Sequence, residues 1–506
     1  MRHRNQSAAF GKASLAALLL LGACATDALD RAPPEPSAGW TIAPPPPASP
    51  GTTGSLAASL LAGPIGPQPA SASRAGDAVV DPNRPYGLAE LIDIAQRSNP
   101  ETRGAWERAR QAALAVGLVE AEYLPEISAE ALAGYQHVTL PIPPSLVPGA
   151  KFTAQSVEFL PALTVKWLLF DFGRRSSAEK AAIAESFTAN VGFTGAHQRL
   201  IFAVSRDYFG LGAARGRLRA AEEAVRNARV VEDTVRDRNA NGLATVVEMA
   251  QAARQTAEAR FNLARSTGAE HSAYQALVAS MGLAPGAVIK VADNSSQALP
   301  VAPAGTVDKF VDDAMANRPD VIAALGKVRA AEAKLDLARA AYNPTVALVG
   351  QGFQNIGGLS AQGSRYYSIN DPGGNILLQL SWPLYDAGAR DAKVGIARSA
   401  VAAAHDELDQ TRNVTVKQVA DAYDAVNTGL AEHEAAVALV AAARTAYDAA
   451  LDAYRHGVGT YTDLVNDETS LTRAHAELED AHADALTAAA ELAFVTGAIT
   501  ATQPSP

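Results

Sequence analysis

The chain has 506 residues, of which 48% are hydrophobic but only 6% aromatic, and it carries a formal net charge of -10. Few aromatic and many alanine residues are typical of long, closely packed helices and argue against a large compact enzyme core. The acidic balance argues against nucleic acid as a partner, because domains that bind nucleic acid are usually basic.

The first 23 residues have the pattern of an export signal. A basic start is followed by the apolar run ASLAALLLLGA, which is too short to remain as a membrane-spanning helix. The run ends at Cys24, the only cysteine in the chain. This pattern resembles the signal peptide of bacterial lipoproteins, in which the cysteine becomes the lipidated first residue. The alternative is an ordinary secretory signal with an incidental thiol. By the same resemblance, Ala25 after the cysteine implies delivery to the outer membrane.

Residues 24–86 are rich in Pro, Ala, Gly and Ser. Such a segment cannot bury enough apolar surface to fold alone. We therefore predict that it is a tether between a lipid anchor and a folded body.

The rest of the chain consists of two copies of one unit, residues 87–285 and 306–499. The stretches WLLFDFGRR, from Trp167, and WPLYDAGAR, from Trp382, share their pattern, and the same offset pairs many later residues. A constant offset over a long span requires elements of equal length, which indicates a duplicated architecture.

Each copy is expected to begin with two helices and two strands. Pro100 and Pro319 separate the two helices, and Pro125 and Pro344 end the second one. A strand-like segment follows, and a loop rich in Pro and Gly leads to a second strand, which we expect at residues 163–167 in the first copy and 378–382 in the second.

The second strands alternate between apolar and polar residues. Leu163, Leu378 and Leu380 fall on one face, and Lys166 and Gln379 fall on the other. Both a membrane wall, with lipid outside and water inside, and a half-buried sheet on a soluble core show this alternation. In a membrane wall we expect the first set to face lipid and the second to face the lumen, with Leu380 near the bilayer midplane.

Long helices are expected after the strands. The segments 173–242 and 388–457 contain no proline, and at ~1.5 Å per residue each would form a helix ~100 Å long. A glycine then turns the chain, and a helix of about 35 residues, some ten turns, returns to Gly282 or Gly497.

These features together resemble the TolC family of outer-membrane efflux ducts over about residues 87–499. The duplicated Asp-x-Gly-x-Arg junction and the turns NGLATVVEM and HGVGTYTDL carry the resemblance. It implies an α+β membrane protein in which four strands from each of three chains close a 12-stranded outer-membrane barrel, continued by a long periplasmic helical barrel. Four strands cannot close alone and open edges are not tolerated in lipid, although the strand count also permits a dimer.

Two kinds of site follow from the resemblance. At the strand-to-helix junctions an aromatic residue marks the membrane interface and Asp-x-Gly ends the strand; these residues are Trp167, Asp171, Gly173, Trp382, Asp386 and Gly388. At the interhelical turns the family contacts a periplasmic adaptor; the matching residues are Gly242, Leu243, Thr245, Gly457, Val458 and Thr460. Helix capping alone explains the Gly and Thr residues, but it does not explain an apolar residue at each turn.

Acidic residues just past the turns imply a periplasmic gate. In the family such residues ring the narrow entrance, and Asp463 matches the first position. Asn466 occupies the second position, with Asp467 beside it, and Glu248 is the counterpart of Asp463 in the first copy. The alternative is that Glu248 and Asp463 are acids favoured at helix starts by the helix dipole.

No catalytic, phosphate-binding or zinc motif is present, so we expect neither an enzyme nor a cofactor. His475, Glu479 and His482 share a helix face and could hold a metal, but we interpret them as part of a solvated face. The resemblance implies a lipid-anchored homotrimer in the outer membrane of a Gram-negative bacterium, extending into the periplasm. It would export small molecules from an adaptor (membrane fusion) protein and an inner-membrane transporter. The alternatives are a TolC-like duct for type I protein secretion and a lipid-tethered coiled-coil protein without a pore.

Overall fold

The computed structural model describes residues 27–38, 81, 83–141, 151–362 and 364–499. The signal segment, Cys24 and most of the predicted tether lie outside these residues. The chain divides into two compact units. The first contains Met1–Arg31, Gln111–Ser186 and Gly326–His405, and the second contains Ala32–Arg110, Phe187–Leu325 and Asp406–Pro506.

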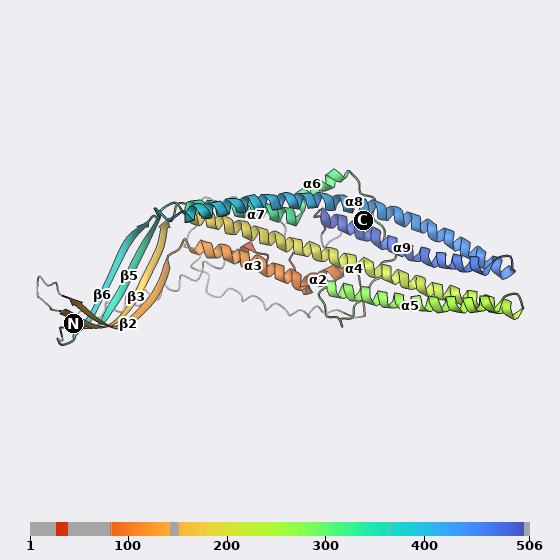
Figure 1. Cartoon of the computed structure of the whole chain (residues 1–506), viewed down its shortest axis with the longest axis horizontal. Coiled ribbons are helices and arrows are strands. Elements are labelled where there is room, and N and C mark those ends of the chain that lie inside the picture. The colour runs from red at the N-terminus through yellow and green to blue at the C-terminus, as the bar shows by residue number, and fades with distance from the viewer. Residues whose placement is uncertain (1–26, 39–80, 82, 142–150, 363, 500–506) are drawn as a thin grey trace. The chain divides into compact units, whose positions relative to one another are not determined.

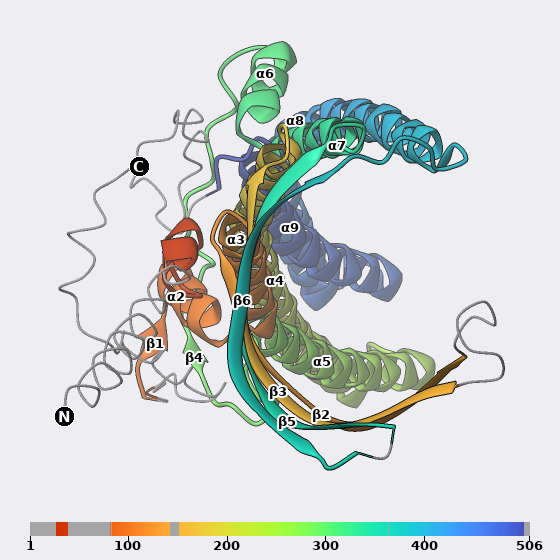
Figure 2. The ribbon, with the colours of Figure 1, turned by 90° about the vertical axis from the view of Figure 1, so that its left-hand side faces the viewer.

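A four-stranded antiparallel sheet occupies the first unit. Its strands are β2 (Glu126–Pro141), β3 (Lys151–Phe170), β5 (Thr345–Ala361) and β6 (Tyr367–Ser381). The order β2-β3-β5-β6 pairs a strand of the first copy with a strand of the second. Figure 2 shows the four strands side by side in one curved sheet. β2 and β6 are its edges, and each has one side without a strand partner among the described residues.

The strands extend well beyond the predicted segments. Much of the stretch that we expected to be a loop rich in Pro and Gly is strand, so that prediction was wrong. Pro161 lies inside β3, where the pairing with β5 is interrupted between Phe159 and Ala162. Pro372 lies inside β6, an edge strand. Proline lacks the N–H that a central ladder needs, so an interruption and an edge are the places that tolerate it.

The register gives the sheet two different faces. Trp167, Leu348 and Leu378 pair in one row, so they point to the same side. This apolar face exposes many large side chains: Ile127, Tyr135, Val157, Phe159, Leu163, Trp167, Ile356, Ile376, Leu378 and Leu380. The opposite, polar face includes Lys166 and Gln379, as the alternation predicted.

The apolar face forms a band of limited height. Along β3 it runs from Val157 to Trp167. At ~3.3 Å per residue this stretch of strand is ~36 Å long. A strand tilted by ~45°, as barrel strands are, would span ~25 Å along the barrel axis over that length. Leu163 pairs with Ala129 and Gly352 near the middle of the band. Leu380 is one residue from the end of β6, so it lies at the edge of this band, whereas we had expected it near a bilayer midplane.

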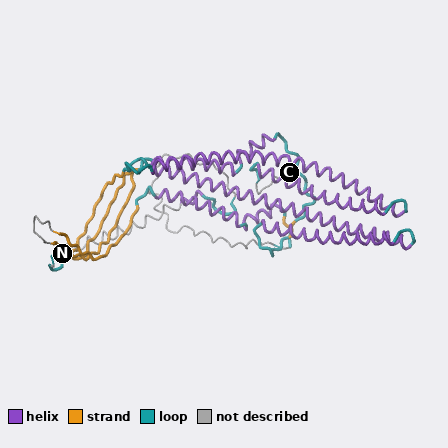
Figure 3. The backbone as a smooth tube through the Cα atoms, viewed as in Figure 1, coloured by secondary structure: helices purple, strands orange, loops and turns teal. Residues whose placement is uncertain are grey.

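Eight helices of the described chain follow the predicted order. In the first copy they are α2 (Leu88–Ser98), α3 (Pro100–Ala121), α4 (Arg174–Ala240) and α5 (Val246–Ser280). In the second copy they are α6 (Val307–Asn317), α7 (Pro319–Ala340), α8 (Ala389–His456) and α9 (Tyr461–Val495). The unbroken helices of 67 and 68 residues and the returning helices of 35 residues are confirmed (Figure 3). Within the described ranges, no helix combines the length and apolarity needed to cross a membrane.

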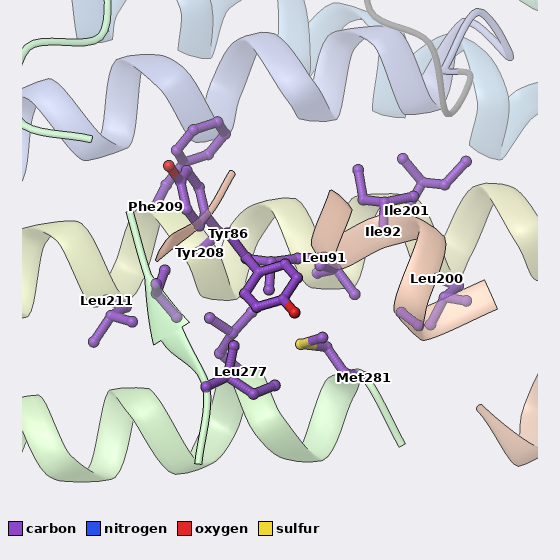
Figure 4. Packing of buried hydrophobic residues seen from close by; sticks show 14 of the residues in the cluster. Tyr86, Leu91, Ile92, Leu200, Ile201, Tyr208, Phe209, Leu211, Leu277 and Met281 are labelled. Atoms are coloured by element: carbon purple, nitrogen blue, oxygen red, sulfur yellow. The ribbon is translucent and has the colours of Figure 1, made fainter. Parts of the chain in front are cut away.

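The largest apolar core of the second unit lies where α2, α4 and α5 meet. Leu91 and Ile92 of α2 share this core with Leu200, Ile201 and Leu211 of α4, and Ile92 lies beside Ile201 (Figure 4). Leu277 and Met281 close the core from α5, and two short strands, β1 (Pro85–Tyr86) and β4 (Lys290–Val291), pair beside it. These contacts fix the segment between the two copies onto the long helices.

Part of the predicted tether is folded. In the first unit, Asp27–Arg31 forms a 3-10 helix in which Ala28 is buried, and Arg31 forms an ion pair with Glu120 of α3. In the second unit, the Trp106 indole N–H donates to the carbonyl of Pro33 at 2.8 Å. Residues 27–38 therefore differ from a free linker, because polar contacts at Arg31, Pro33 and Pro36 and the buried side chains of Ala28 and Ala32 compensate for their low apolar content.

Candidate functional site

A buried ion pair fixes the strand-to-helix junction of the first copy. Asp171 follows β3 directly, and its Oδ2 accepts hydrogen bonds from the Arg175 backbone N–H at 2.8 Å and from Arg175 Nε at 2.9 Å. The side chains are only 8% and 7% exposed. The Arg175 guanidinium also donates to the carbonyl of Glu122 and lies over the ring of Tyr123, 4.5 Å from its centroid. Asp171 therefore caps α4 and orients the arginine that fastens α4 to the end of α3.

The second junction repeats this geometry. Asp386 Oδ2 accepts from the Arg390 backbone N–H at 3.1 Å and from Arg390 Nε at 2.8 Å, and Arg390 lies over Tyr342. Burial raises the pKa of the Asp386 carboxyl, but the bond to Arg390 and its charge outweigh burial and hold the pKa below its usual value. Trp382 donates its indole N–H to the carbonyl of Tyr342, as Trp167 does to that of Tyr123.

The turn at each junction needs two residues in the left-handed region. Gly173 and Gly388 have φ values of +95° and +84°, which glycine adopts without strain. Phe172 and Ala387, which precede them, have φ values of +52° and +56°, which cost a residue with a side chain about 1 kcal/mol or more. The Asp-x-Gly pattern indicated the turn, but it did not indicate that the middle residue is left-handed or that Tyr123 and Tyr342 receive the arginines.

The two interhelical turns lie in the second unit, where one joins α4 to α5 and the other joins α8 to α9 (Figure 1). Gly242 and Gly457 adopt φ values of +74° and +76°, and the next residues, Leu243 and Val458, donate back to the carbonyls of Arg238 and Ala453. This arrangement is a glycine cap of the preceding helix. The Leu243 and Val458 side chains are 65% and 83% exposed, so capping does not account for their apolar character.

Arg238 joins the two turns. Its guanidinium donates to the carbonyl oxygens of Leu243 in the first turn and of Tyr454 and Arg455 at the end of α8. It also lies over the Tyr454 ring, 4.7 Å from the centroid. A cation at a helix C-terminus compensates its unpaired carbonyls. Nothing in the sequence singled out Arg238, because its hydrogen-bond partners are backbone atoms and the ring that it covers is far away in the sequence.

The predicted gate acids take part in helix caps. Glu248 accepts from the Thr245 backbone N–H at 2.6 Å, and its own N–H donates to Thr245 Oγ1, which is a capping box. Asp463 donates its N–H to Thr460 Oγ1 and accepts from that hydroxyl at 2.6 Å. Asp463 is exposed and Glu248 is partly exposed. Capping and a role at an entrance are therefore compatible, and the gate stays a prediction.

A buried carboxyl that the sequence did not single out lies one position beyond Asp467. Glu468 of α9 is 2% exposed and accepts a hydrogen bond from Gln255 Nε2 of α5 at 3.0 Å. Burial raises the pKa of the Glu468 carboxyl, and the bonds from Gln255 and Thr472 only partly offset that effect. The neighbouring acids gave no indication of this burial, because helical rotation alone separates the buried position from the exposed ones.

We expect the Glu468→Gln variant to be more stable than wild type at pH 7.5. A raised folded-state pKa means that Glu468 favours the folded state most when protonated, so this contribution is lost as pH rises from the ordinary glutamate value through the folded value. Thermal unfolding of both proteins at pH 5 and pH 7.5 measures the effect. The gain should shrink at pH 5, and an equal gain at both pH values would contradict this account.

The residues His475, Glu479 and His482 do not form the solvated face that we expected. The ring of His475 lies 3.8 Å from Glu223, Glu479 pairs with Arg219 of α4 at 3.2 Å, and His482 Nε2 lies 2.9 Å from the Gln297 carbonyl oxygen. These side chains hold α9 against α4 and against the segment between the copies. Sequence spacing placed them on one face, but the partners that cover that face come from distant segments.

The outer membrane efflux protein family matches residues 91–283 and 310–498 of the chain. Protein CyaE of Bordetella pertussis is 30% identical over 354 residues, covering 69% of this chain and 71% of that protein. The cation efflux system protein CusC of Escherichia coli K12 is 25% identical over 335 residues, covering 66% of this chain and 69% of that protein.

The fold agrees with solved structures. A crystal structure of a membrane protein from Pseudomonas aeruginosa superimposes with a TM-score of 0.69 at 24% identity, over 81% of this chain and 93% of that one. A family match over two long segments, a relative of 30% identity and a shared fold lead to one conclusion. The chain belongs to the outer membrane efflux protein family, whose members reside in the outer membrane of Gram-negative bacteria.

Proposed function

We propose that this protein is the outer-membrane exit duct of a tripartite efflux system, and that three copies close a 12-stranded barrel. The observation that carries the proposal is the two-faced sheet with two edges lacking a strand partner among the described residues. An exposed apolar face suits lipid and a polar face suits a water-filled interior, while edges in lipid must pair with another copy. The work of such a protein is conduction and not catalysis.

The interhelical turns support a role in docking a periplasmic adaptor. Exposed apolar residues at both turns, Leu243 and Val458, give such a partner a surface to bury. The relative CusC bears the name of a cation efflux system protein, which favours export of small solutes over protein secretion for this chain. The inner-membrane transporter would then select the cargo.

Two measurements test the duct. Purified full-length protein should migrate as a trimer in SDS before heating and as a monomer after heating, and it should produce discrete conductance steps in planar bilayers. A stable oligomer without conductance would favour the coiled-coil alternative. An oligomer of two chains would overturn the 12-stranded barrel.

We expect Asp463→Asn to lower cation selectivity if three copies of Asp463 ring the pore axis. Like charges held close together focus the field and attract cations. Reversal potentials under a salt gradient, compared with those of Glu248→Gln and Asp467→Asn, measure the effect. If Asp463 acts only as a capping acid, the substitution should cost about 0.3–1 kcal/mol of local helix stability and leave selectivity unchanged. A shift in Asp467→Asn alone would transfer the role to that neighbour.

Cys24→Ser should abolish incorporation of a labelled fatty acid, if Cys24 is the lipidated residue. The pore itself should still form, because a closed barrel is held in the membrane by its own apolar face. Labelling followed by electrophoresis checks the first result, and bilayer conductance of the same preparation checks the second. Unchanged labelling in the variant would rule out lipidation at this cysteine.

A further inference from the structure

The polar face of the sheet contains a cavity of about 220 Å³. It lies in the first unit and is lined by β2, β3, β5 and β6 together. The side chains that matter for its chemistry are Gln136, Val138, Ser156, Glu158, Asn355, Leu359 and Ile369. The register places all of them on the polar face, opposite the exposed apolar band.

Glu158 has glycine on both sides. Gly134 of β2 and Gly357 of β5 are its direct partners on the neighbouring strands. Neither glycine places a side chain beside the carboxylate, and on the β5 side the Val157 carbonyl oxygen lies where a Cβ of Gly357 would be. Among the described residues no basic side chain lies within ion-pair distance of Glu158, which leaves its charge available.

Asn355 lines the same cavity, and its side-chain oxygen has no hydrogen-bond partner among the described residues. Asn355 Oδ1 is inaccessible to solvent, and no donor within the described residues reaches it. An unsatisfied buried acceptor costs about 1–3 kcal/mol, so buried acceptors normally have partners. A bound molecule could donate to this oxygen once the Asn355 amide turns toward the cavity. Asp371, directly opposite Asn355 on β6, adds negative charge at the rim.

The remaining wall is aliphatic. Val138, Leu359 and Ile369 line the cavity from three strands. A hydrated metal ion gains nothing from such a wall, and the described residues contain no cluster of three His, Cys, Asp or Glu side chains arranged for a metal. Acceptors beside aliphatic side chains instead suit a molecule with a cationic head that donates hydrogen bonds and a short apolar body.

We propose that this cavity is a binding site for small organic cations of the primary-ammonium class. The ammonium group donates to the Glu158 carboxylate and to Asn355 Oδ1, and the alkyl part packs on Val138, Leu359 and Ile369. The proposal rests on the proposed function only in assigning the polar face to the interior of the duct. There the site would hold a cationic solute transiently on its way out.

Titration calorimetry of n-butylammonium into purified full-length wild type tests the site, with 1-butanol as the neutral probe. Binding should be saturable, 1-butanol should not compete, and Glu158→Gln should weaken binding about tenfold or more, since a charge-assisted hydrogen bond is lost. The matched control is Glu130→Gln, which removes an acid from the same face outside the cavity. It should leave affinity within about twofold, as expected for a screened, distant charge.

Three more variants test the Asn355 acceptor and the open space of the cavity. Asn355→Asp should strengthen binding, because it adds a charge while keeping an acceptor, and Asn355→Leu should weaken it. Ala154→Leu should block binding by filling the hollow, since Ala154 also lines it. All variants must form the same heat-modifiable oligomer as wild type. Equal losses in Glu158→Gln and Glu130→Gln would reduce the effect to diffuse charge and overturn the site.

Conductance measurements on the same preparations test the proposed duct separately from the proposed binding site. A conducting wild type without saturable n-butylammonium binding would overturn the cavity site and leave the duct. Binding that depends on Glu158 in a protein that does not conduct would leave the site and overturn the duct.

Discussion

Replacing Arg175 by Met should lower the free energy of unfolding by about 3–5 kcal/mol, because it leaves the carboxylate of Asp171 buried without its cation. The pair is more than nine-tenths buried, and the guanidinium also satisfies the carbonyl of Glu122 at the end of α3. Denaturant unfolding of the purified protein, followed by tryptophan fluorescence, measures the loss. Trp167 reports on the same junction.

The second junction supplies the matched control. The Arg390 and Asp386 side chains are 12% and 31% exposed, so water compensates the remaining carboxylate after Arg390→Met. We expect a clearly smaller loss than for Arg175→Met. Equal losses would show that burial does not determine the effect. Replacing Asp171 and Arg175 together by Leu and Met should recover part of the loss, because no charge then remains buried.

Leu163→Arg should reduce the stability of the membrane-inserted protein by about 2–4 kcal/mol, since Leu163 lies near the middle of the apolar band and faces lipid in the proposed barrel. Ala162→Arg, one residue away, should be tolerated. The register places Ala162 on the polar face directly opposite Glu130, so the new cation gains a partner.

Leu380→Arg should cost less, about 0–1 kcal/mol, because this residue lies at the edge of the band. The yield of heat-modifiable oligomer after refolding into lipid vesicles compares the three variants and wild type. A comparable loss in Leu163→Arg and Ala162→Arg would contradict the assignment of the two faces. A larger loss in Leu380→Arg than in Leu163→Arg would contradict the position of the band.

Proline and glycine positions explain why the helices could be predicted from the sequence. The proline-free intervals ending at Gly242 and Gly457 gave helices whose ends the structure places within a few residues. The extent of the strands was harder to predict, because prolines such as Pro161 and Pro372 are typical of loops. Their tolerance depends on pairing with neighbouring strands, which local sequence does not contain.

The residues of the candidate site also differ in whether local sequence could predict them. Asp171 and Gly173 were predicted at the junction because capping and a left-handed turn are local requirements. The contact of Arg175 with Tyr123 joins residues far apart in the sequence, and the burial of Glu468 depends on α5. Neither has a local signature. The unpartnered Asn355 oxygen became visible only when the register placed four strands on one surface.

The two edge strands have a genetic consequence. In the proposed assembly, β2 of one chain must pair with β6 of another, so no chain can complete its own sheet. A defect confined to one edge would then be inherited as a dominant trait, because every assembly that incorporates a single defective chain contains an open seam. Null alleles, which supply no chain at all, would be recessive to a wild-type copy. The same gene should therefore yield mutations of opposite dominance, separated by whether the altered chain can still join its neighbours.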